Sequence, residues 1–225
     1  MHIRTPAIPA ILAATAALAL GATACGSDES SSSSSSGSSG SSQSAKPVAD
    51  IPSLSGKSTA VTLDAGFVDA LTQLKLTPSP VGDATISEQG IASFPITGGN
   101  VKYFKPGSVS PYVQGEIDHD GSGLQLEGGG KTVQLTDFVV DPGASVLTGK
   151  VTVDGKEAAA SAPLFFLDGR TLKPLEAKDN GTAVLEGTTV KFKDESAQLL
   201  NDTFGVDALK GGLEVGVAKI TVNTK

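Results

Sequence analysis

The sequence predicts a mainly β protein, with an antiparallel, β-sandwich-like domain that contains two short helices and follows a disordered leash. Many short segments alternate apolar and polar residues, as strands with one buried face do. Asx-Gly pairs separate several of these segments and favour the tight turns of β-hairpins. Near the N-terminus, a long serine run has nothing to bury and is typical of disordered chain.

The N-terminus has the pattern of a bacterial export signal. An uncharged apolar stretch, residues 7–22, follows Arg4 and is shorter than a membrane-spanning helix requires. Residues 22–25 (Ala-Thr-Ala-Cys) then resemble the lipobox of bacterial lipoproteins, in which the Cys is acylated. Cys25 is the only Cys of the chain, so it has no intramolecular disulfide partner. We predict a lipoprotein signal peptide at 1–24, lipid attachment at Cys25, and anchoring on the extracellular face of the cell membrane.

The remainder divides by composition. Residues 25–55 are predicted to be a lipidated, serine-rich disordered linker, and residues 56–225 a single β domain. Without Arg4, the 17 Lys and Arg fall to 16, against 24 Asp and Glu. This acidic balance argues against nucleic-acid partners and against docking on anionic lipid. The oligomeric state is not predicted by any of these features.

Glycine pairs predict where hairpins turn. We expect a hairpin tip at Gly128-Gly129-Gly130, which lies between two strand-like segments. Three further hairpins are expected at Asp154-Gly155, Asp168-Gly169 and Asn180-Gly181. The last strand, near residues 213–222, changes its apolar phase partway along, as a β-bulge would cause.

Two segments have helical spacing. Asp64 is expected to cap a helix over residues 65–74, in which Phe67 and Leu71 share one face. Asp194 is expected to cap a second helix that stops at Gly205. A strand-like segment precedes each helix and another follows it, which hints at two similar units flanking the sheet.

Residue types that carry catalysis are sparse. His119 is the only His after the signal peptide, and no Gly-x-Ser-x-Gly elbow is present. The triple glycine leads into a strand without a following Lys-Ser/Thr, so it does not match a phosphate-binding loop. Carboxylate pairs for glycoside hydrolysis stay open, because the sequence does not give their separation. We predict no catalytic residues and no enzyme activity.

Residues 118–123 (Asp-His-Asp-Gly-Ser-Gly) form the most unusual run of the domain. They resemble part of a calcium loop, but the twelfth position, where such a loop has an acid, is Gly129. We therefore expect a hairpin loop and no metal ligands, with His119 exposed. Tyr103 and Tyr112 are expected to pack on the sheet, their hydroxyls in water. The alternative is a Tyr phenolate with a nearby His, which suits ferric haem.

The stretch that contains His119 resembles part of a known protein family. The segment 113–121 (Val-Gln-Gly-Glu-Ile-Asp-His-Asp-Gly), followed by Leu124-x-Leu126 and by 133–142, resembles the core of HtaA-type domains. These are exported actinobacterial modules, several of which bind haem. The resemblance continues through residues 190–222, where a strand, a short helix and a closing strand recur.

The resemblance implies both a function and a gap. In haem-binding members, a Ser-Phe-x-x-Tyr motif on the first helix supplies the iron ligand, and a His in the sheet supports it. His119 matches that His, but Ala70 stands at the ligand position. Haem binding is thus expected to be weak or absent, and a Tyr at position 70 is expected to strengthen it. Tyr103 or Tyr112 would have to substitute as ligand.

Three functions remain as hypotheses from the sequence. The first is a non-enzymatic surface module that binds haem or another small apolar ligand, marked by an aromatic cleft that includes Tyr112 and His119. The second is a structural or adhesive envelope protein with no pocket. The third is an enzyme, which requires a cluster of acids with perturbed pKa values in a cleft.

Overall fold

The computed structural model describes residues 45–224, which form one antiparallel sheet with two α-helices. The predicted signal peptide, Cys25 and most of the serine-rich segment lie outside the described residues. The mainly β prediction with two short helices is confirmed. The strands are β1 (Ala49–Ile51), β2 (Lys57–Leu63), β3 (Thr77–Gly82), β4 (Thr85–Ile86), β5 (Ile91–Pro95), β6 (Gly98–Tyr103), β7 (Val113–Gly128), β8 (Lys131–Asp141), β9 (Val146–Val153), β10 (Lys156–Asp168), β11 (Glu176–Lys178), β12 (Thr182–Phe192) and β13 (Glu214–Asn223), and the helices are α1 (Ala65–Gln73), α2 (Asp194–Phe204) and the 3-10 turn η1 (Gly169–Thr171).

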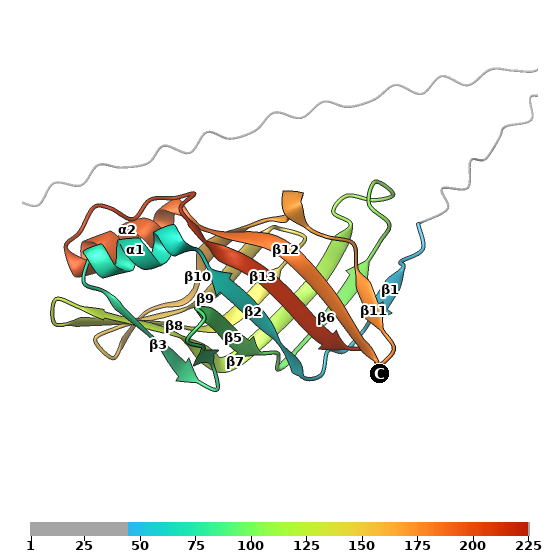
Figure 1. Cartoon of the computed structure of the whole chain (residues 1–225), viewed down its shortest axis with the longest axis horizontal. Helices are drawn as coiled ribbons and strands as arrows, with labels where there is room; N and C mark the ends of the chain where they lie inside the picture. The colour runs from blue at the N-terminus through green and yellow to red at the C-terminus, as the bar shows by residue number, and fades with distance from the viewer. Residues whose placement is uncertain (1–44, 225) are drawn as a thin grey trace, which may run out of the picture. The chain divides into compact units, whose positions relative to one another are not determined.

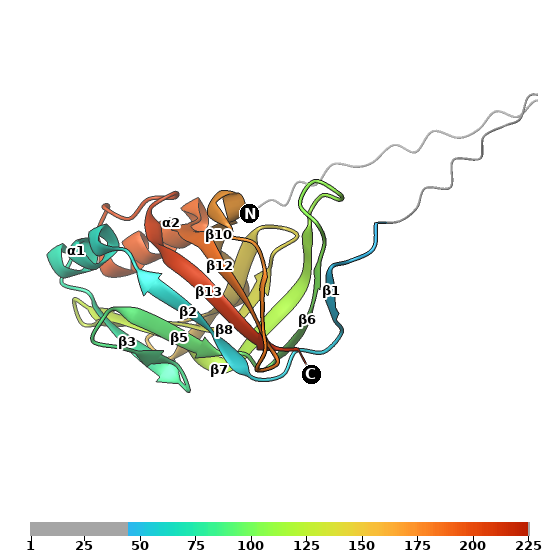
Figure 2. The ribbon, with the colours of Figure 1, turned by 45° about the vertical axis from the view of Figure 1, so that its right-hand side comes forward.

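The sheet curls until its two ends approach each other. Its strands follow the order β1-β6-β7-β8-β9-β10-β12-β13-β2-β5-β4. Strands β6 to β10 pair with their neighbours in sequence, whereas β1 pairs with β6 and β13 with β2 across long stretches of chain. β3 pairs with β7 near one end of this path, and β4, which follows β3 directly, pairs with β5 at the other end. Figures 1 and 2 show β2, β12 and β13 lying across β7 and β8. One sheet therefore supplies both walls of the sandwich-like domain.

The long strand β7 changes partner at its middle. Its first half pairs with β6 and its second half with β3, while β8 runs along the opposite side. The change falls between His119 and Gly123, where the register with β8 also shifts. A Cβ at Gly82 would overlap the carbonyl oxygen of Gly121, so only glycine allows β3 to approach here. The hairpin loop expected at residues 118–123 is therefore wrong: the run is a bulge inside one strand.

Most of the predicted turns are confirmed. Asp154-Gly155 joins β9 to β10 with positive φ at both residues, 49° and 77°. Gly129-Gly130 joins β7 to β8, and Asn180-Gly181 joins β11 to β12. The hairpin expected at Asp168-Gly169 is wrong, because the Asp168 side chain accepts a hydrogen bond from the Arg170 backbone N–H and starts η1.

The helices begin and end nearly as expected. The Asp64 carboxylate accepts hydrogen bonds from the backbone N–H groups of Gly66 and Phe67, at 2.8 and 3.2 Å, and so caps α1. Asp194 does not cap α2, since Lys193 occupies the N-cap position and Asp194 lies in the first turn. There its charge still suits the positive end of the helix dipole. Gly205 ends α2 in the left-handed conformation, with φ of 68°.

An aromatic cluster closes the helical end of the domain. Phe67 of α1 packs on Phe192 of β12 at 5.9 Å between ring centroids, and Phe192 packs on Phe165 of β10 at 5.2 Å. All three side chains are buried. Figures 1 and 2 show α1 and α2 together at this end, opposite the loop between β6 and β7. Among the described residues, no helix has the length and apolarity needed to span a membrane.

The predicted similarity of two strand–helix units has a spatial counterpart. β2 leads into α1 and β12 leads into α2, and β13 pairs with both strands. In β13 the buried positions Val215 and Ala218 are three apart, and its register with β12 shifts near Gly216, which confirms the change of phase. The sheet also starts before Gly56, since β1 pairs with β6 within the segment assigned to the linker.

Candidate ligand cavity

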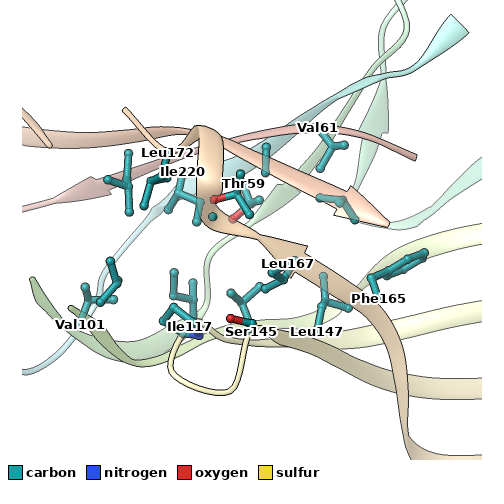
Figure 3. A pocket seen from close by; sticks show the side chains of 18 of the residues that line it. Thr59, Val61, Val101, Ile117, Ser145, Leu147, Phe165, Leu167, Leu172 and Ile220 are labelled. Atoms are coloured by element: carbon teal, nitrogen blue, oxygen red, sulfur yellow. The ribbon is translucent and has the colours of Figure 1, made fainter. Parts of the chain in front are cut away.

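The curled sheet encloses a cavity of about 880 Å³. This volume lies within the roughly 300–1,000 Å³ of small-molecule sites. Figure 3 shows side chains converging on it from opposite walls, with Thr59, Val61 and Ile220 on one side and Ile117 and Leu147 on the other. Most of the lining side chains are aliphatic or aromatic. The domain therefore has an apolar interior space large enough for a ligand.

Loops form the accessible side of this cavity, which we call the mouth. The exposed lining residues are Ser110 and Pro111 in the loop between β6 and β7, Phe166 near the end of β10, and Gly169 and Arg170 in the segment after β10. The half-buried turn between β8 and β9 adds Ser145. These three segments adjoin the ends of β7, β9 and β10, where regular pairing stops. Access to the cavity is thus governed by loops, whereas its walls are strands.

His119 lines the cavity and is only 1% exposed, so the expectation of an exposed loop residue is wrong. Its Nδ1 lies 3.1 Å from the Phe138 carbonyl oxygen, and its Nε2 lies 2.8 Å from Thr59 Oγ1. The carbonyl can only accept, so Nδ1 carries the proton and Nε2 accepts from the Thr59 hydroxyl. Burial lowers the pKa of His119 and keeps the ring neutral. Both ring nitrogens are therefore occupied by protein partners.

The polar groups of the interior are satisfied without a ligand. Within residues 45–224, no buried side-chain nitrogen or oxygen lacks a hydrogen-bond partner. The edge of Phe94 also meets the His119 ring, at 6.5 Å between centroids and 87° between planes. A molecule inside the cavity would therefore meet mainly hydrocarbon surface, and it would gain by burying apolar area.

Tyr103 and Tyr112 lie at the mouth side of the same cavity. Their rings meet edge to face, with centroids 6.0 Å apart and planes at 84°. Tyr103 is only 6% exposed, at the end of β6, and Tyr112 is half-buried just before β7. The structure thus brings Tyr103, Tyr112 and His119 to one cavity. Ala70 is not among them, because no α1 residue lines the cavity.

A charged cluster at the mouth was missed by the sequence analysis. The Asp168 carboxylate accepts two hydrogen bonds from Arg170 Nε, at 2.9 and 3.1 Å, and one from Nη2 at 2.6 Å. Lys191 Nζ lies 3.0 Å from the same carboxylate. These two cations hold the pKa of Asp168 well below its usual range. In the sequence, Asp168-Gly169-Arg170 has the pattern of a turn. Lys191 is distant along the chain, so its contact with Asp168 is not predicted by any local pattern.

Possible metal ligands are scattered. Nowhere in residues 45–224 do three or more His, Cys, Asp or Glu side chains gather in a way that could hold a metal ion. Asp120 and Asp137, the acids nearest the bulge of β7, instead bond to Thr97 and to the backbone N–H of Gly121. The run that resembled a calcium loop thus uses its polar groups to join strands.

Comparison with solved structures supports the fold predicted from the resemblance. The chain is similar to the C-terminal domain of HtaA from Corynebacterium glutamicum, with a TM-score of 0.52 and 12% sequence identity. The match covers 77% of this chain and 98% of that domain. A domain-swapped dimer of a variant of the same domain matches with a TM-score of 0.44 at 12% identity, over 72% of this chain and 92% of the other.

The other two comparisons find no relative. No protein-family model matches the chain, and a search of curated proteins finds no match. The similarity to HtaA therefore establishes an HtaA-like fold, and at this identity it establishes the fold alone. A ligand has to be argued from the cavity itself.

Proposed function

We propose that this domain is a non-enzymatic binding module that takes up one small apolar molecule in the cavity between its curled walls. The observation that carries the proposal is the apolar interior space of about 880 Å³. A structural or adhesive protein would gain stability by filling such a space, because dispersion contacts are lost around it. We further propose that a lipid on Cys25 holds the module at the extracellular face of the cell membrane.

The ionisable groups on the cavity wall favour binding over catalysis. His119 has both nitrogens engaged, and Asp168 is held by Arg170 and Lys191. Neither group is placed as a free acid or base toward the cavity, as general acid–base catalysis requires. The wall instead offers apolar contact area, which is what an uptake or storage module needs.

Haem is one candidate occupant. The resemblance to HtaA-type domains, several of which bind haem, suggests this ligand. Tyr103 and Tyr112 are the phenols on the cavity wall that could reach an iron. His119 does not fit as an iron ligand while Phe138 and Thr59 hold its two nitrogens. A bound haem would supply a planar apolar body and an iron in need of an axial oxygen. We therefore expect weak hemin binding, with one of the two tyrosines as ligand.

Filling the cavity tests the proposed function. Ala218 is buried on β13 and lines the cavity, whereas its neighbour Val217 is 38% exposed and does not. Successive residues of a strand point to opposite faces, so Val217→Phe adds bulk outside while Ala218→Phe adds it inside. We expect Ala218→Phe to weaken binding of a neutral fluorescent probe, N-phenyl-1-naphthylamine, at least tenfold. Val217→Phe should bind like the wild type.

Thermal unfolding of both variants guards against misfolding as the cause. Equal probe affinity in the wild type and a folded Ala218→Phe variant would show that the cavity is not the site. A hemin titration followed at the Soret band tests the haem candidate separately. A saturable one-to-one shift that Tyr112→Phe or Tyr103→Phe abolishes would identify the ligand.

A further inference from the structure

We infer that the cavity takes an anionic amphiphile, a long-chain fatty acid or a similar acyl carboxylate, with its chain inside and its head group beside Arg170 at the mouth. This inference rests on the proposed function and adds the chemical class and the orientation of the ligand. It follows from the unequal distribution of polar groups along the cavity wall.

The interior selects for hydrocarbon. In its buried polar pair, His119 and Thr59 bond to each other, and His119 also bonds to the Phe138 carbonyl, so neither ring nitrogen is left for a ligand. A ligand group that needs hydrogen bonds would lose its bonds to water on entry and find no replacement. Methylene groups instead lose water-exposed area and gain contacts with side chains such as Val61 and Leu147.

The mouth selects for negative charge. The Arg170 side chain is 82% exposed and lines the cavity, whereas its partner Asp168 is 7% exposed. Arg170 binds Asp168 through Nε and Nη2, which leaves Nη1 without a hydrogen bond to any residue of 45–224. Because Lys191 also binds Asp168, two cations share one carboxylate and the cluster keeps one positive charge.

This local surplus contrasts with the chain as a whole, whose net charge is -7. An anionic head group at the mouth would thus find a guanidinium nitrogen, Nη1, in a cluster that has one surplus positive charge. A neutral or cationic head group would not gain this contact.

The test measures two quantities on the full chain, below the ligands' micelle concentrations. The first is how affinity grows from eight to sixteen carbons, for fatty acids and for the corresponding alcohols. We expect about fourfold per methylene until the cavity is filled. The second is the ratio of acid to alcohol affinity at equal chain length. We expect the acid to bind about three- to tenfold more tightly at low salt, a ratio that salt reduces.

Three variants separate the mouth from the rest of the surface. Arg170→Gln should bring the acid to the affinity of the alcohol. Asp168→Asn keeps an oxygen that can cap η1 but removes the competing charge, so it should increase the ratio. Lys131→Gln is the matched control, because Lys131 also pairs with an aspartate, Asp154 at 2.8 Å, but lies on the hairpins away from the lining. It should leave the ratio unchanged.

Each outcome decides one of the two claims. If acid and alcohol bind with equal affinity and Arg170→Gln changes neither, the inference about the head group is wrong. The cavity proposal still stands in that case if affinity grows with chain length. No dependence on chain length, with no loss in Ala218→Phe, overturns both. If no fatty acid binds while hemin gives a Soret shift that Tyr112→Phe removes, the occupant is haem and the inference of an acyl carboxylate is wrong.

Discussion

The two ends of the cavity are built in different ways. At the helical end, Phe67, Phe165 and Phe192 interlock beneath α1, and their contacts join two strands to a helix. At the mouth, the exposed Arg170 lies in η1 just after β10 and pairs with the buried Asp168 at the end of that strand. We therefore expect stability to be concentrated at the first end and, under the proposed function, selectivity for a ligand at the second, because recognition requires groups that still lack a partner.

The same contrast separates the two polar clusters on the wall. The His119–Thr59 pair is neutral and buried, and the Phe138 carbonyl completes it. The Asp168–Arg170 pair is charged and exposed on its cationic side. A buried pair is costly to break, since the remaining group loses its partner in an apolar environment. An exposed ion pair contributes little to folding, since water replaces either partner.

The largest effect on stability is expected at the helical end. Phe192→Ala removes a ring that is 3% exposed and packed between two others. We expect the free energy of unfolding to fall by about 3–5 kcal/mol, as for other buried aromatic truncations. Phe166→Ala, on β10 beside the mouth and 44% exposed, is the control and should cost under about 1 kcal/mol. Urea denaturation of both variants measures the difference. Similar losses would refute the contrast between the two ends.

A smaller loss is expected from the buried polar pair. His119→Leu keeps similar bulk but leaves the Phe138 carbonyl and the Thr59 hydroxyl without their partner. We expect a loss of about 1–3 kcal/mol in unfolding free energy. Arg170→Ala is the comparison at the mouth, where the expected change is within about 0.5 kcal/mol. If Arg170→Ala cost more than His119→Leu, the assignment of stability to the interior would be wrong.

The buried imidazole also predicts a pH dependence. Burial lowers the pKa of His119, against the opposing effects of the Phe138 carbonyl and Asp120, so the unfolded chain binds a proton more readily. Stability should be fully present above the unfolded pKa of about 6.5 and should decrease as the pH falls below it. His119→Leu should lack this slope between pH 7 and 5. The lowered pKa of Asp168 affects stability only below about pH 4, where the carboxylate takes up a proton in the unfolded chain but stays charged in the folded one, so the two effects separate.

Local signals predicted much of the fold. Asp64 and Gly205 mark helix ends through hydrogen bonding and backbone conformation within a few residues, which a sequence carries directly. The turns at Asp154-Gly155 and Asn180-Gly181 are equally local. The curl of the sheet is not, because it depends on β3 and β4 pairing with strands that come from distant parts of the chain.

The errors at residues 118–123 and at Asp168 have the same origin. A glycine-rich polar run has the composition of a loop, and only the pairing of β3 and β8 on either side makes it a bulge within β7. This pairing turns His119 inward, so its burial depends on the tertiary structure. At Asp168, a capping side chain competes with the primed turn that Asp-Gly favours. The sequence predicted a cleft that includes Tyr112 and His119, and the fold brings Tyr103 to the same cavity.

The smallest expected effect concerns Ala70, where the resemblance to haem-binding domains would have a tyrosine. Ala70 lies on α1, which contributes nothing to the cavity wall, so a side chain there would not face a ligand held in the cavity. We now expect Ala70→Tyr to leave hemin affinity unchanged within about twofold, whereas Tyr112→Phe lowers any affinity that exists. Ala70 is partly buried, so thermal unfolding must first show that the variant folds. A Soret titration then decides. A clear gain in hemin affinity for Ala70→Tyr would place haem against α1, outside the cavity, and would mean that the helical end of the domain recognises a ligand as well as stabilising the fold.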